Sequence, residues 1–147
     1  MTSKSYRLAS GGRLIDRTKK VHFSFDGKPM SGFAGDTVAS AVLANGQRVF
    51  GRSFKYHRPR GVIGLGSEEM NALLGIGDGA RHEPNLRATQ VELHEGLTAV
   101  SQNRWPSLNF DIGAINSKFS RFIPGGFYYK TFMWPKAFWK HVYEPFI

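Results

Sequence analysis

The residues best suited to chemistry in this chain form a basic stretch between positions 48 and 60. It contains five cations and a histidine and no acid: Arg48, Arg52, Lys55, His57, Arg58 and Arg60. Cations this close repel one another, so an anion is expected to offset them. Because arginine forks bind phosphate oxygens in pairs, we predict that Arg52, Lys55, Arg58 and Arg60 contact a cofactor phosphate. The alternative is a solvated face, or salt bridges to a neighbouring domain.

Two aromatic residues within the same stretch, Phe54 and Tyr56, allow a second interpretation. Rings that stack on bases beside cations that follow the backbone are typical of single-stranded nucleic-acid binding. Such a module predicts repeated aromatic–basic motifs or a known module signature, and the sequence contains neither. Nucleic-acid binding is therefore kept only as an alternative function of a different class.

Other reactive groups give weaker signals. Glu68 and Glu69 are adjacent and no nucleophile accompanies them, which favours a helical turn capped by Ser67 over acid–base catalysis. The histidines lack metal-ligand spacing: His22, His57, His82, His94 and His141. We expect neither a catalytic residue nor a metal site in this chain.

Composition limits the class of protein. The chain has 147 residues, 41% of them hydrophobic, which suits one folded domain. Lys and Arg number 20 against 11 acids, a formal net charge of +9, so an anionic partner is expected. Cysteine is absent, which excludes disulfides and mildly favours the cytoplasm. No run of about 18 apolar residues and no signal peptide is visible, so we expect a cytoplasmic protein without a membrane span.

The first half of the chain predicts a hairpin followed by a helix. Residues 21–25 alternate between apolar and polar, and Asp26-Gly27 is typical of a tight turn into a second strand over 28–32. A helix over 37–46 is predicted, with Asp36 as its N-cap and Gly46 as its stop. This order is typical of an α+β fold of the β-grasp, ubiquitin-like type.

The second half predicts shorter elements and a change of character. We expect strands over 47–50, 89–94 and 97–100, and mostly loop over 61–79 with one helical turn near 67–73. Thirteen of the 20 aromatic residues lie in 104–147. The predicted organisation is an extended arm (1–18), a β-grasp domain (19–103) and an aromatic-rich extension (104–147) that packs on this domain or on partner domains.

Residues 26–89 resemble a plant-type [2Fe–2S] ferredoxin domain. That cluster is held by four thiolates spaced C-x4-C-x2-C plus one distant cysteine. The matching positions here are Ile63, Glu68, Asn71 and Thr89. An aliphatic side chain, a carboxylate, an amide and a hydroxyl lack the soft anionic sulfur that iron–sulfur clusters require. We therefore predict a ferredoxin-like domain without its cluster.

Four longer strings carry a more specific resemblance. They are GRSFKYHRPRG (51–61), EPNLRATQVEL (83–93), SQNRWPS (101–107) and GFYYKTFMWP (126–135). Together they resemble the N-terminal region of the alpha subunit of heterotetrameric sarcosine oxidase. The resemblance covers nearly the whole chain, which corresponds to a domain-length piece of that longer subunit.

The resemblance implies a part in the oxidative demethylation of sarcosine to glycine, with peroxide formation and methylene transfer to tetrahydrofolate. The assembled enzyme would carry NAD, FAD, FMN and tetrahydrofolate. The partners would be the rest of the alpha subunit and the beta, gamma and delta subunits. We predict a structural, docking domain that is not catalytic by itself and holds no cofactor alone. A further alternative is the small domain of a related amine or opine dehydrogenase, whose cysteines would serve as an electron relay.

Overall fold

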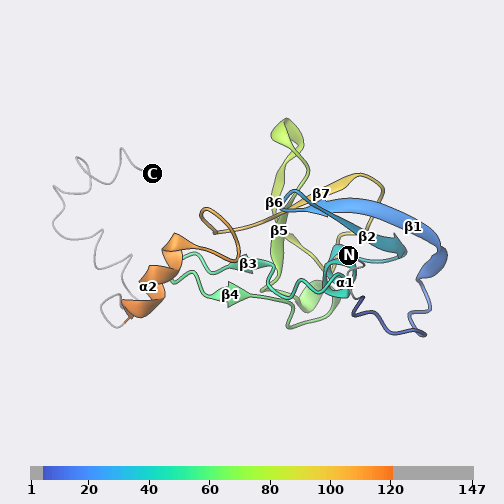
Figure 1. The fold of residues 1–147 in the computed structure, drawn as a ribbon, viewed down its shortest axis with the longest axis horizontal. Helices are drawn as coiled ribbons and strands as arrows, with labels where there is room; N and C mark the ends of the chain where they lie inside the picture. The colour runs from blue at the N-terminus through green and yellow to red at the C-terminus, as the bar shows by residue number, and fades with distance from the viewer. Residues whose placement is uncertain (1–4, 121–147) are drawn as a thin grey trace.

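A computed structural model describes residues 5–120 of the chain (Figure 1). Its helices and strands are β1 (Asp16–Phe25), β2 (Lys28–Ala34), α1 (Val38–Ala44), β3 (Gly51–Arg52), β4 (Pro59–Arg60), β5 (Leu73–Ile76), β6 (Glu83–Arg87), β7 (Leu97–Ser101) and α2 (Ile115–Lys118). Three 3₁₀ turns separate them: η1 (Gly66–Glu68), η2 (Gly79–Arg81) and η3 (Ile112–Ala114). Most of the predicted aromatic-rich extension lies outside the described residues.

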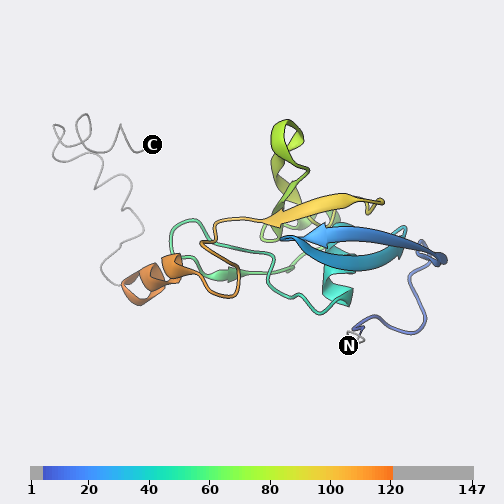
Figure 2. The same ribbon diagram turned by 45° about the horizontal axis from the view of Figure 1, so that its top comes forward.

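Five strands of the described part form one mixed sheet in the order β2-β1-β7-β5-β6. The first and last strands in sequence, β1 and β7, are parallel neighbours at its centre, and the other pairs are antiparallel. Helix α1 lies beneath β1 and β2 in both views, while β3, β4 and α2 extend away from the sheet (Figures 1 and 2). This arrangement confirms the predicted β-grasp, ferredoxin-like fold.

The first hairpin follows local turn chemistry. Asp26 and Gly27 both have positive φ angles, of 50° and 74°, as the tight turn requires. β1 begins at Asp16, earlier than the predicted strand, because its first half pairs with the end of β2 across an irregular register. The hairpin places Phe23 and Phe25 in the core, where they pack with residues of α1 and β7.

The helix was predicted correctly, but its cap was not. The N-cap of α1 is Thr37, whose hydroxyl accepts from the Ser40 N–H while the Ser40 hydroxyl accepts from the Thr37 N–H. Asp36 is wholly buried one residue earlier and serves another purpose, described below. The next two free N–H groups of the helix, those of Val38 and Ala39, donate to the carbonyls of Val91 and Ala88.

Two of the predicted strands, 89–94 and 47–50, are wrong, and the contacts of the helix N-terminus explain the first. Residues 89–94 run across the helix N-terminus instead of joining the sheet, and their alternation arises because Leu93 points into the core. Residues 47–50 are irregular. The strands that complete the sheet, β5 and β6, fall where glycine, proline and exposed residues hid any period-2 pattern.

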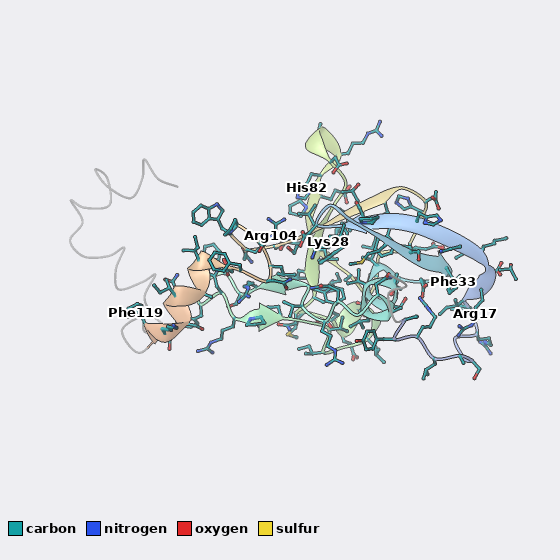
Figure 3. All side chains as sticks on the ribbon, viewed as in Figure 1. Arg17, Lys28, Phe33, His82, Arg104 and Phe119 are labelled. Carbon is teal, nitrogen blue, oxygen red and sulfur yellow. The ribbon has the colours of Figure 1, made fainter. Side chains whose placement is uncertain are left out.

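The N-terminal segment is fastened to the domain by one ion pair. Arg7 donates from its two terminal nitrogens to the two oxygens of Asp36, at 2.9 and 2.6 Å, and its guanidinium also lies over the ring of Phe33. Asp36 additionally accepts from the Ser40 hydroxyl and the Phe33 N–H. Burial raises the pKa of Asp36, but these donors outweigh it and hold the pKa below its usual range. Phe33 lies at the opposite end of the molecule from Phe119 (Figure 3).

We expect Arg7→Ala to lower the free energy of unfolding by about 3 kcal/mol, because it leaves the buried Asp36 carboxylate without its countercharge. Urea unfolding followed by circular dichroism measures this change. Arg13→Ala, which removes an exposed arginine of the same segment, is the control. Equal losses in the two variants would contradict the role assigned to the ion pair.

Candidate functional site

The loop from 61 to 72, which contains three of the four predicted ligand positions, is organised by the carboxylate of Glu69. Glu69 is wholly buried, and its two oxygens accept four backbone N–H groups. Oε2 accepts from Ile63 at 2.7 Å and from Gly64 at 2.8 Å. Oε1 accepts from Asn71 at 2.6 Å and from Ala72 at 2.9 Å. The carboxylate therefore joins the two ends of the loop from its centre.

These donors determine the charge of Glu69. Burial alone raises its pKa, but the N–H groups of Gly64, Ala72, Ile63 and Asn71 outweigh that effect and lower the pKa from 4.5 to about 2. Glu69 is therefore ionised at neutral pH. The predicted helical turn is present only as the 3₁₀ turn η1 (Gly66–Glu68), shorter than expected. The predicted cap is wrong, because the N-cap is Leu65, which makes no side-chain cap, and Ser67 lies inside the turn.

The four residues at the predicted ligand positions have different surroundings. The N–H groups of Ile63 and Asn71 point to the Glu69 carboxylate, and the Asn71 side chain donates to the Gly61 carbonyl at 2.8 Å. The Thr89 hydroxyl donates to the Gly66 carbonyl at 2.6 Å, which ties the loop to the chain after β6. Glu68 is exposed on the surface.

This donor set does not fit a thiolate-bound [2Fe–2S] cluster. The chain has no cysteine, and none of the four side chains supplies sulfur. The backbone N–H groups of two ligand positions, Ile63 and Asn71, are already bonded to a permanent internal anion. Four backbone N–H groups of the loop therefore already have the Glu69 carboxylate as their acceptor.

Of the predicted phosphate contacts, Arg52 points into the protein. Its guanidinium donates to the carbonyls of Leu108, at 2.8 and 3.2 Å, and of His57, at 2.9 Å. It also lies 3.5 Å from the buried carboxylate of Asp111, which contacts the His57 ring at 2.8 Å. Arg52 therefore joins the basic stretch to residues 104–111 and is not available as an open phosphate fork.

Of the other three cations, two lie at the same aromatic ring and the third contacts an amide. Lys55 and Arg58 both lie over the Tyr56 ring, 5.2 and 4.8 Å from its centre, and Arg60 donates to the Asn71 side-chain oxygen. Arg58 and Arg60 are exposed. That these residues bind a cofactor phosphate stays a prediction, and Arg58 and Arg60 are the two arginines whose exposure suits it best. Because its own cations cover Tyr56, the ring is not presented as a simple stacking platform for bases.

Sequence reasoning missed Asp111. Its carboxylate also accepts from the N–H groups of Trp105, at 2.9 Å, and Gly113, at 3.2 Å. Burial raises the pKa of Asp111, whereas these donors and His57 lower it, and the net pKa lies below the usual range. The available signal was that Asp111 is one of only two acids in residues 104–147.

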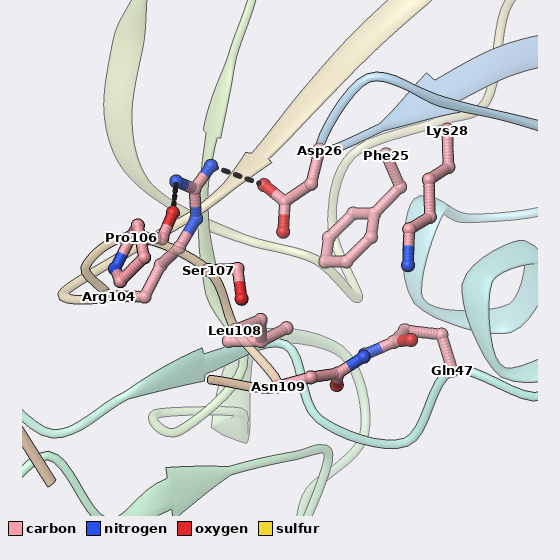
Figure 4. A pocket seen from close by; sticks show the side chains of 9 residues that line it. All are labelled: Phe25, Asp26, Lys28, Gln47, Arg104, Pro106, Ser107, Leu108 and Asn109. Carbon is pink, nitrogen blue, oxygen red and sulfur yellow. Dashed lines mark hydrogen bonds and ion pairs between the residues drawn. The ribbon is translucent and has the colours of Figure 1, made fainter. Parts of the chain in front are cut away.

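A hollow of about 190 Å³ lies beside the turn at Asp26 between β1 and β2 (Figure 4). Arg104 reaches from one wall to Asp26, with 3.1 Å between nitrogen and oxygen, and also donates to the Ser101 hydroxyl and the Pro106 carbonyl. Asp26 accepts further from the N–H and hydroxyl of Ser101. These contacts secure the end of β7 to the turn, so we assign this hollow a structural role.

The mixed sheet with its single packed helix, in the part of the chain that the structure describes, is that of a ferredoxin-type domain. The family described as a 2Fe-2S iron-sulfur cluster binding domain matches residues 18–104, more than half of the chain, and the chain belongs to this family. It is 61% identical over 143 residues to sarcosine oxidase subunit alpha of Rhizobium meliloti (strain 1021). That match covers 97% of this chain and 14% of that subunit. The predicted resemblance to sarcosine oxidase alpha subunits is confirmed.

Two more distant matches were found. Sarcosine oxidase subunit alpha of Corynebacterium sp. (strain U-96) is 43% identical over 106 residues, which cover 67% of this chain and 11% of that subunit. A solved structure of L-proline dehydrogenase from P. horikoshii has a TM-score of 0.49 and 23% identity, covering 61% of this chain and 17% of that one. The chain therefore spans a small fraction of each relative. In residues 5–120, no helix has the length and apolar character that crossing a membrane requires.

We expect Glu69→Gln to lower the free energy of unfolding by about 4 kcal/mol, because the amide NH₂ would face two buried N–H donors in place of a charged acceptor. Urea unfolding at neutral pH measures the change. Glu68→Gln, the exposed neighbour, is the matched control and is expected to change little. A Glu69→Gln variant as stable as this control would contradict the assigned role.

The same carboxylate predicts a pH dependence. Its pKa is depressed in the folded state, so its contribution to stability is complete above the unfolded value of 4.5 and is lost as the pH falls towards about 2. The stability difference between the unmodified chain and Glu69→Gln should therefore shrink between pH 5 and pH 2. Denaturant unfolding at a series of pH values measures it. A difference that stays constant through this range would refute the prediction.

Proposed function

We propose that this chain is a cluster-free docking domain of a sarcosine oxidase alpha subunit. The observation that carries the proposal is the Glu69 carboxylate, which accepts the N–H groups of Ile63 and Asn71, two of the four predicted ligand positions. A loop held in this way keeps its shape without iron. Its contribution to an enzyme is then to bind and position other parts of the assembly, without carrying electrons.

The reaction belongs to the assembled enzyme. By its resemblance to the relatives, we propose that this enzyme demethylates sarcosine oxidatively to glycine, forms peroxide and passes the methylene group to tetrahydrofolate. NAD, FAD and FMN would lie in other domains and subunits, and the partners would be the rest of the alpha subunit with the beta, gamma and delta subunits. We place this assembly in the cytoplasm.

A chimera tests the docking role. These 147 residues replace the matched segment of the Rhizobium meliloti alpha subunit, and the chimera is co-expressed with the other subunits of that enzyme. We expect a flavin-containing complex that produces peroxide from sarcosine. It should lack stoichiometric iron and acid-labile sulfide attributable to this domain, since the donor set supplies no thiolate. Stoichiometric iron that disappears with Glu69→Gln would contradict the proposal.

The Glu69→Gln chimera separates a structural role from a catalytic one. We expect less assembled complex but unchanged peroxide turnover per flavin, because the domain would support the assembly and not the chemistry. The Glu68→Gln chimera is the control for both readouts. Full assembly with reduced turnover per flavin would show that the loop takes part in the reaction, and would overturn the docking assignment.

A further inference from the structure

The loop that Glu69 organises displays apolar side chains on its outer side. Ile63 and Met70 are 73% and 75% exposed, and both line a hollow of about 400 Å³. We call these two side chains and the hollow the loop face. Large apolar side chains gathered at one exposed concavity commonly mark a surface that binds another protein surface.

The buried carboxylate fixes the position of both residues. Glu69 accepts the N–H of Ile63 itself, and the N–H groups of Asn71 and Ala72 that directly follow Met70. The backbone on either side of the hollow is therefore held by the same charged group. A preorganised surface loses little conformational freedom on binding, which favours association.

The electrostatic character of the loop face is positive. Two cations line the hollow, Arg52 and Arg60, together with four side-chain amides and no acid: Asn71, Asn85, Gln102 and Asn103. Arg52 is already balanced by the nearby carboxylate of Asp111. Arg60, at the exposed rim, is held by the neutral Asn71 side chain. A matching surface would carry an apolar side chain for the hollow and a carboxylate for Arg60.

We propose that the loop face packs against the part of the sarcosine oxidase alpha subunit that lies outside the segment this chain matches. This inference rests on the proposed docking function and specifies the surface and its occupant. The chain spans 14% of the Rhizobium meliloti subunit, so most of that polypeptide is available as a partner. A partner in the same polypeptide is present at a high effective concentration, which favours it over a separate subunit or a second copy.

Photo-crosslinking in the assembled chimera tests the assignment. A benzophenone amino acid is placed at position 63 or 70, and in a control at Leu14, which is 82% exposed and precedes β1. Crosslinked peptides are identified by mass spectrometry. We expect positions 63 and 70 to crosslink to the remainder of the alpha subunit, near an acidic residue, and position 14 to give no crosslink there.

Charge substitution supplies a second readout. Met70→Asp should leave the thermal unfolding of the 147-residue chain unchanged, because Met70 is exposed, while it lowers the yield of assembled chimera severalfold. Leu14→Asp should lower neither. An unchanged yield with Met70→Asp would overturn the proposal.

The crosslinks distinguish this inference from the function on which it rests. Crosslinks from positions 63 and 70 to a second alpha subunit, to another subunit, or to no protein at all in an active complex would overturn the loop-face assignment while leaving the docking function intact. A chimera that fails to assemble, although the native subunit assembles, would overturn both.

Discussion

Four backbone N–H groups that converge on the Glu69 carboxylate hold the loop from 61 to 72 and connect it to the rest of the domain. Ala72, one of the four donors, accepts through its carbonyl from the Ala88 N–H. The Ala88 carbonyl in turn accepts from Ala39 in the first turn of α1. The loop, the chain after β6 and the helix N-terminus are therefore joined by one series of hydrogen bonds that begins at this carboxylate. A charged acceptor at that position strengthens the first bonds of the series.

Two more buried carboxylates in the described residues accept hydrogen bonds from the protein. Asp36 and Asp111 are also buried. Asp36 accepts one backbone N–H and pairs with Arg7, and Asp111 accepts two backbone N–H groups and contacts His57. Each lies beside irregular chain, at the N-terminal segment and at the cis-proline loop after β7. In a chain with a net charge of +9, the three buried acids of the described residues thus lie beside irregular chain. A buried carboxylate that loses its donors is costly, so each of them specifies one local conformation.

Rules that act over a few residues predicted the hairpin and α1 from the sequence. The tight turn requires two residues that tolerate positive φ, and Asp26-Gly27 supplies them. The apolar stripe of α1 and the glycine that ends it lie within ten residues of each other. β5 and β6 pair with each other across a short connection, but they escaped prediction because Gly75 and Pro84 interrupt any alternating pattern. Glu69 could not be told from Glu68 because burial is a tertiary property. Arg52 and Arg58 likewise look equivalent in the sequence, although one faces Asp111 and the other solvent.

An internal carboxylate changes what a cluster loop can contribute. A metal-bound loop depends on iron supply and on the oxidation state of the metal, because the ligands and the surrounding hydrogen bonds respond to the charge of the cluster. The charge of Glu69 is constant at neutral pH, since its pKa is about 2. The hydrogen bonds that Glu69 accepts therefore do not depend on a bound metal. A loop whose backbone N–H groups bond an internal carboxylate can therefore be well ordered in a chain that has no cysteine.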